Sequence, residues 1–128
     1  MCNIGQAGGA AETCYRLAQH WIPIIKPKAV FMLSPPATRR EFWMSDTNVE
    51  IIGPRSTIPK HMVSEQEIQI NRERVVAAIN SVCASLSIPF QYVYLHPLIR
   101  DWGKMPDVGR DGTHPGPKTH KMIAEHFK

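Results

Sequence analysis

The stretch Asn3-Ile4-Gly5-Gln6-Ala7-Gly8-Gly9-Ala10 decides the predicted fold, because it changes from a strand-like pattern to a helical one. Met1–Ile4 resembles the end of a strand, and the glycines after it predict a tight turn. A helix is expected over Ala10–Trp21, with one apolar face at helical spacing and with Pro23 limiting its extension. The continuous apolar run Ala29–Leu33 indicates a second strand, buried on both faces. This strand–turn–helix–strand order predicts a βαβ unit of a parallel sheet.

The middle of the chain adds a hairpin and a long helix. Glu41–Met44 and Asn48–Ile52 are expected to pair across a short polar turn, with Gly53-Pro54 ending the hairpin. Ser64-Glu65-Gln66-Glu67 is a capping box, in which a hydroxyl and a carboxylate three residues later bind exposed backbone N–H groups. The helix that it opens is expected to continue to about Ser85, with a mainly apolar stripe.

The end of the chain combines a buried strand, an irregular loop and a terminal helix. Phe90–Leu95 is rich in aromatic and β-branched residues, which favours a strand, and residues 96–107 form a long loop. The Gly/Pro-rich stretch Gly109–Pro117 then leads into a helix near Lys118–Phe127. It holds Asp111 and His114. A carboxylate this close to an imidazole can orient it and stabilise its charged form, as a catalytic base requires.

Composition and charge exclude several classes of protein. The chain has 128 residues, of which 43% are hydrophobic and 20% charged, so a single folded domain over residues 1–128 is expected. The net charge is +4, but the basic residues are dispersed, so no nucleic-acid partner is expected. No apolar run is long enough to predict a membrane span. The odd number of cysteines and the absence of a leader pattern favour the cytoplasm; the three thiols are expected in the core.

No metal site or cofactor is expected. The histidines His114, His120 and His126 recur every six residues, which spreads them around a helix instead of gathering them on one side. The glycines of residues 5–9 do not match the dinucleotide-binding pattern.

The two ends of the chain together resemble the SGNH (GDSL-type) hydrolase family. Asp111-Gly112-Thr113-His114-Pro115 before a terminal helix is similar to that family's last block, and Asn3-Ile4-Gly5-Gln6-Ala7-Gly8 to its second. The resemblance implies a three-layer α/β/α flavodoxin-like fold and an ester hydrolase acting on a small-molecule or glycan ester. It also implies that His114 is the base, that Asp111 orients it, and that the Gly8 N–H stabilises an oxyanion.

Two blocks of the family have no counterpart in these residues. The Gly-Asp-Ser turn that carries the nucleophile is absent, and Ser34, at the end of a predicted strand, has proline neighbours unlike a nucleophile elbow. We therefore expect an N-terminally truncated domain that lacks one central strand and has no nucleophile of its own. The block that supplies an oxyanion-binding Asn is also replaced, and Thr38 or Arg39 is the candidate substitute donor. The alternative is a non-catalytic α/β module that binds carbohydrate or, at the helix N-terminus after the glycines, an anion. The oligomeric state is left open.

Overall fold

The computed structural model describes residues 2–6, 9–35, 39–52, 64–94, 107–110 and 115–127. The chain divides into two compact units, Met1–Tyr92 and Val93–Lys128. The architecture is mixed α/β with a small parallel sheet, which confirms the predicted fold class at that level.

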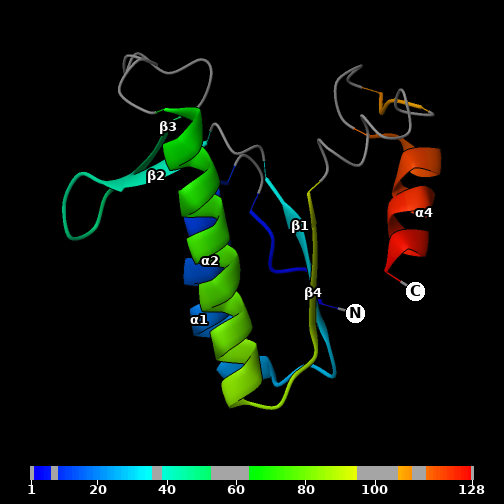
Figure 1. Cartoon of the computed structure of the whole chain (residues 1–128), viewed down its shortest axis with the longest axis horizontal. Helices are drawn as coiled ribbons and strands as arrows, with labels where there is room; N and C mark the ends of the chain where they lie inside the picture. The colour runs from blue at the N-terminus through cyan, green and yellow to red at the C-terminus, as the bar shows by residue number, and fades with distance from the viewer. Residues whose placement is uncertain are drawn as a thin grey trace. The chain divides into compact units, whose positions relative to one another are not determined.

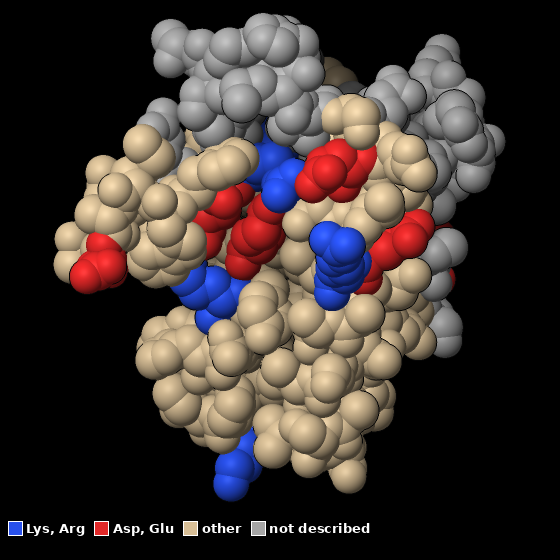
Figure 2. Space-filling model, turned by 60° about the vertical axis from the view of Figure 1, so that its left-hand side comes forward, with Lys and Arg blue, Asp and Glu red and all other residues tan. Residues whose placement is uncertain are grey.

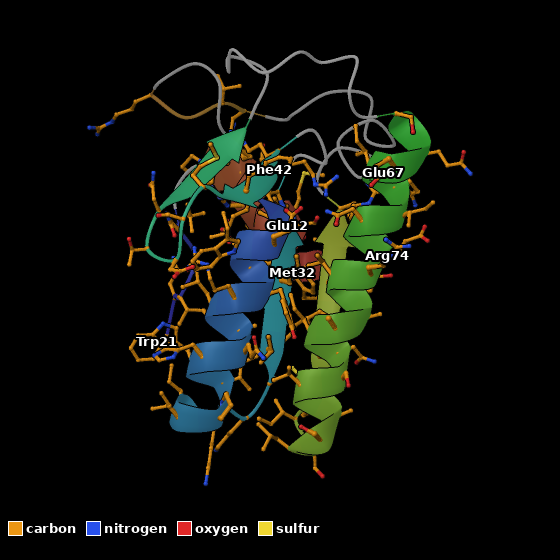
Figure 3. All side chains as sticks on the ribbon, turned by 90° about the vertical axis from the view of Figure 1, so that its left-hand side faces the viewer. Glu12, Trp21, Met32, Phe42, Glu67 and Arg74 are labelled. Atoms are coloured by element: carbon orange, nitrogen blue, oxygen red, sulfur yellow. The ribbon has the colours of Figure 1, made fainter. Side chains whose placement is uncertain are left out.

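The first unit is built on two parallel strands covered by two helices. Strand β1 (Val30–Ser34) lies beside β4 (Phe90–Tyr94), and the Val30 N–H donates to the Pro89 carbonyl at 2.9 Å. Helices α1 (Ala11–Ile25) and α2 (Glu65–Ser85) lie side by side over one face of this sheet (Figures 1 and 3). The order β1–α2–β4 is a βαβ unit whose crossover also contains the hairpin.

The core of this unit lies between the helices and the sheet. Ile22 of α1 and Ile79 of α2 are each only 2% exposed, and Met32 of β1 is buried beneath them. Burial of three large apolar side chains is worth roughly 1.5–3 kcal/mol each, so this interface holds the layers together. The other buried residues from the two helices are Ala11, Thr13, Ala18, Val75, Val76 and Cys83. The apolar stripe predicted for α2 is therefore confirmed at its centre.

Local signals set the helix ends. The Ser64 hydroxyl accepts a hydrogen bond from the Glu67 N–H at 3.1 Å, which confirms the serine half of the predicted capping box, and α2 ends at Ser85 as expected. Helix α1 continues past Pro23 to Ile25, so the expected end at Trp21 was four residues too early. It stops at Lys26, which adopts the left-handed conformation with φ of 47° and donates its N–H to the Ile22 carbonyl.

The predicted hairpin is confirmed. Strand β2 (Arg40–Trp43) pairs antiparallel with β3 (Val49–Ile52), with Arg40 opposite Ile52 and Trp43 opposite Val49. In the turn, the Asn48 N–H donates to the Ser45 hydroxyl at 3.1 Å. Such side-chain contacts to the backbone favour turns over continued strand.

Two expectations for the strands were wrong. Residues 2–6 do not form a strand; the Asn3 side chain accepts a hydrogen bond from the Gly5 N–H at 2.9 Å, a local turn that competes with extended pairing. Strands β1 and β4 are not buried on both faces. Phe31 is 56% exposed and Tyr92 44%, because α1 and α2 cover only the face that carries Met32.

The second unit contains helix α4 (Pro117–His126), which confirms the predicted terminal helix to within one residue. Ile123 and Thr119 are buried, while Met122 and Phe127 are half-buried. An antiparallel bridge joins Val108 to Pro115 just before the helix. Across the described residues, no helix is both long enough and apolar enough to cross a membrane.

Candidate functional site

Most of the predicted site residues lie outside the described part of the chain. Asp111, His114, Gly8 and Thr38 belong to this group, whereas Arg39 is described. The structure does describe the residues that flank them. These contacts involve the residues on either side of Asp111 and His114, and the residues at the start of α1.

Asp107 anchors the start of α4. Its carboxylate accepts the Thr119 N–H at 2.8 Å and the Lys118 N–H at 3.0 Å, two of the donors that a helix leaves unpaired at its N-terminus. The Thr119 hydroxyl is completely buried and lies 2.9 Å from both the main-chain carbonyl and the carboxylate of Asp107. Partial burial raises the pKa of the Asp107 carboxyl, but the hydrogen bonds from Lys118 and Thr119 outweigh it and hold the pKa below its ordinary value.

Gly116 permits this close approach. Its N–H donates to the Asp107 carbonyl at 3.2 Å, and a Cβ at this position would lie 2.5 Å from Asp107 Oδ2 and 2.8 Å from the Val108 carbonyl oxygen. No side chain fits there without displacing Asp107 or the backbone. Glycine is therefore required here by space.

Together these contacts close the segment that carries Asp111 and His114. Val108 and Pro115 are bridged, and Asp107 is bound to Thr119, so both ends of residues 109–114 are tied to the N-terminus of α4. Closing a short loop this way reduces the conformational freedom that ordering it would otherwise cost. This role of Asp107 was not predicted, since the residue was expected to end an irregular loop. Its partner Thr119 is twelve residues away, and no local motif marks such a pair.

The other candidate region is the end of the first unit where α1 and α2 begin and β1 ends (Figure 1). In an open α/β sheet, ligands bind at this carboxyl end. On the face drawn in Figure 2, acidic and basic side chains gather on this part of the unit, whereas the opposite end shows a single basic side chain and no acidic one. The members of the cluster are Glu12, Thr13, Arg16, Arg40, Glu41, Glu67 and Asn71.

Among the ion-paired side chains of this cluster, Glu41 of β2 is the most buried, with only 2% of its side chain exposed. The Thr13 hydroxyl donates to Glu41 Oε2 at 2.5 Å, and the Arg16 guanidinium binds both carboxylate oxygens, at 3.0 and 3.1 Å. Burial raises the pKa of Glu41, but the hydrogen bonds from Arg16 and Thr13 outweigh it, so the pKa lies below its ordinary value. The hairpin is thus joined to the first turns of α1 by a charged, two-pronged contact.

Glu12 forms the second contact between these elements. Its Oε1 accepts hydrogen bonds from Arg40 Nε at 2.6 Å and from Asn71 Nδ2 at 2.9 Å, which links α1 to both β2 and α2. Glu12 Oε2 is buried without a partner among the described residues. Figure 3 shows Glu12 near the top of α1 and Glu67 at the start of α2.

The neighbouring arginines differ in their partners. Arg40 is paired with Glu12, and its Nη1 lies 3.9 Å from Glu67. Arg39 is half-buried, and no carboxylate of the described residues is paired with it.

Ser34 does not have the environment of a nucleophile. It is 5% exposed, and its hydroxyl donates to the Pro35 carbonyl at 3.3 Å. A nucleophilic serine instead needs an exposed hydroxyl beside a base. Its burial agrees with the absence of a nucleophile elbow in the sequence.

Within the described ranges, no group of three or more His, Cys, Asp or Glu side chains is placed to hold a metal ion. The three thiols differ: Cys83 is buried as expected, Cys14 is half-buried, and Cys2 is exposed, so the expectation of a core position was wrong for Cys2.

No protein-family model, curated protein or solved structure matches the chain. The resemblance to SGNH hydrolases thus rests on the sequence blocks alone.

Proposed function

We propose that this chain supplies the acid–base half of an SGNH-type ester hydrolase with a flavodoxin-like fold. The observation that supports it most is the closure of the Asp111–His114 segment by Asp107, Thr119 and the Val108–Pro115 bridge. A catalytic pair needs a fixed geometry, and the described residues on both sides of Asp111 and His114 are held to each other and to the N-terminus of α4.

In the proposed reaction the nucleophile is a serine from outside residues 1–128. Its hydroxyl attacks the carbonyl carbon of an ester while His114 takes the proton and Asp111 stabilises the resulting imidazolium. The carbonyl oxygen becomes an oxyanion, which accepts hydrogen bonds from the Gly8 N–H and from Arg39. His114 returns the proton to the departing alkoxide, leaving an acyl-serine. Water, activated by His114, then attacks the acyl-serine, which releases the carboxylic acid and restores the serine.

The cluster around Glu41 supports the oxyanion part of the proposal. It holds β2, which follows Arg39 directly, against the first turns of α1, which follow Gly8 closely in the chain. A donor that is fixed before the reaction costs no reorganisation when charge develops on the substrate. The unpaired state of Arg39 among the described carboxylates fits this role.

The test is hydrolysis of p-nitrophenyl acetate by residues 1–128 and by a version extended upstream in its genomic frame. We expect no activity above buffer for residues 1–128. The extended version should hydrolyse the ester, and His114→Ala should reduce kcat/KM by roughly 10³-fold or more. His120→Ala, an exposed histidine on α4, is the matched control and should leave the rate unchanged.

Hydrolysis that survives His114→Ala, or none in the extended version, would exclude the enzyme. The alternative of a non-catalytic carbohydrate- or anion-binding module would then be tested by titrating the chain with acetylated oligosaccharides and inorganic phosphate.

A further inference from the structure

The end of the first unit opposite the charged cluster carries an exposed apolar surface. Trp21 is 40% exposed, Ile24 61% and Ile25 40%. Their spacing of three and four residues places them on one face of α1, and the buried Ile22 lies on another. Figure 3 shows Trp21 pointing outward from α1, away from α2. Leu86, just after α2, is also exposed, and both helices end at this end of the unit (Figure 1).

Among the described residues of the first unit, the charged side chains next to this surface are basic. Lys26 and Lys28 follow α1 directly, and both are exposed. The sequence contains no Asp or Glu between Glu12 and Glu41, nor between Glu73 and Asp101. These two acid-free stretches contain β1, β4, most of α1 and the second half of α2, the elements that form this end. Figure 2 shows the same contrast, with uncharged residues and a single blue side chain at the end away from the cluster.

We propose that this surface, Trp21–Ile24–Ile25 with Lys26 and Lys28, binds the surface of an anionic lipid bilayer. The tryptophan and isoleucine side chains insert at the boundary between headgroups and acyl chains, because their apolar surface is buried from water there. Lysines at the edge of the apolar face remain in water beside anionic headgroups. Because the stretches that form this end hold no Asp or Glu, they add no repulsion that would oppose this contact.

This binding is peripheral and does not depend on the proposed hydrolase activity. The chemistry on the surface also distinguishes it from ordinary solvent-exposed residues. Single apolar side chains are common on protein surfaces, whereas three adjacent ones on one helix face beside lysines make a contiguous patch.

The experiment measures sedimentation of the whole chain with vesicles of phosphatidylserine and phosphatidylcholine, and with phosphatidylcholine alone. We expect binding to the anionic vesicles that weakens as salt is raised. Trp21→Ser combined with Ile24→Ser should weaken binding by about tenfold or more. Lys26→Gln and Lys28→Gln should each weaken binding to the anionic vesicles by about fivefold.

The chain offers matched controls. Trp43 is 59% exposed on the hairpin at the other end of the unit, and Lys118 and Lys121 are exposed on α4. Trp43→Ser, and Lys118→Gln with Lys121→Gln, should bind vesicles as the wild type does. Circular dichroism checks folding; if the Trp21/Ile24 variant does not fold, the Lys26/Lys28 variant decides the test.

Three results would overturn the proposal. They are equal binding to neutral and anionic vesicles, no vesicle binding at all, and equal losses in the control variants. Size-exclusion chromatography is run on the same samples. A dimer that the Trp21/Ile24 variant abolishes, without vesicle binding, would assign the surface to a second copy of the chain instead.

Discussion

The buried Thr119 hydroxyl lies 2.9 Å from both the main-chain carbonyl and the carboxylate of Asp107, twelve residues earlier. This pair ties the first turn of α4 to the chain before the glycine-rich segment. The segment containing Asp111 and His114 therefore begins and ends at the same point of the structure. Loss of the pair should loosen this segment first.

Thr119→Val tests the role of this pair. Valine keeps the shape of threonine but cannot hydrogen bond to Asp107, so the segment before α4 should open more often. We expect faster trypsin cleavage after the exposed Arg110 and faster amide exchange at Lys118 and Thr119. Thr47→Val, at an exposed turn position, is the control and should leave both rates unchanged. Equal cleavage rates in the wild type and Thr119→Val would show that the pair does not hold the segment.

Acid should have a similar local effect. The pKa of Asp107 is lowered in the folded chain from an ordinary value of 3.8. Its contribution to stability is therefore complete above that value and is lost as pH falls through the lowered pKa. Amide exchange in the first turn of α4, followed by NMR below pH 4, should accelerate in the wild type more steeply than in Asp107→Asn. Parallel pH profiles of the two proteins would contradict this.

Gly116→Ala should displace Asp107. The added Cβ meets Asp107 Oδ2 at 2.5 Å and the Val108 carbonyl oxygen at 2.8 Å, and such overpacking costs about 1–3 kcal/mol. Urea unfolding measures the loss. In an Asp107→Ala background the same substitution should cost less, since one of the two clashing groups is gone. Additive effects of the two substitutions would refute the steric explanation.

Glu41→Gln should lower the free energy of unfolding by about 1–3 kcal/mol at pH 7, because it weakens the bonds from Arg16 and Thr13. The pKa of Glu41 is lowered from an ordinary 4.5, so the wild type should lose this advantage as pH falls below that value. Urea unfolding at pH 7 and pH 3 measures the difference in free energy of unfolding between the two proteins at each pH. Glu125→Gln, exposed on α4, is the control. A stability difference that is independent of pH would count against a charged Glu41 contact.

The cysteines should react in the order Cys2, Cys14, Cys83. Cys2 is exposed, whereas burial raises the pKa of the other two thiols, and Glu12 and Glu41 add to the rise at Cys14. Alkylation with iodoacetamide followed by mass spectrometry at pH 8 measures the order. Fast modification of Cys83 in the folded chain would contradict its complete burial.

Elements with strong local signals could be predicted from the sequence. The helix opened by Ser64, the hairpin around Ser45 and the terminal helix after Pro117 each follow from residues close in the chain. Which faces of β1 are buried could not be predicted, because a continuous apolar run does not indicate which elements pack on each face. Phe31 is exposed for that reason.

The side-chain contacts that build the candidate site were not predictable. Glu41 binds Thr13 and Arg16 across 25 to 28 positions, and Asp107 binds Thr119 across twelve. Such pairs form where the fold brings distant residues together, and no spacing rule marks them. Asp111, His114 and Gly8 lie outside the described residues, so their roles stay predictions from the sequence blocks.

NMR titration of His114 in the whole chain and in Asp111→Asn tests whether the two residues form an acid–base pair. If Asp111 orients and stabilises the imidazolium, its removal should lower the titration midpoint of His114 by roughly one unit, because the neighbouring negative charge is lost. His20 on α1 serves as the internal reference. A His114 midpoint that is the same in both proteins would contradict an acid–base pair in this loop.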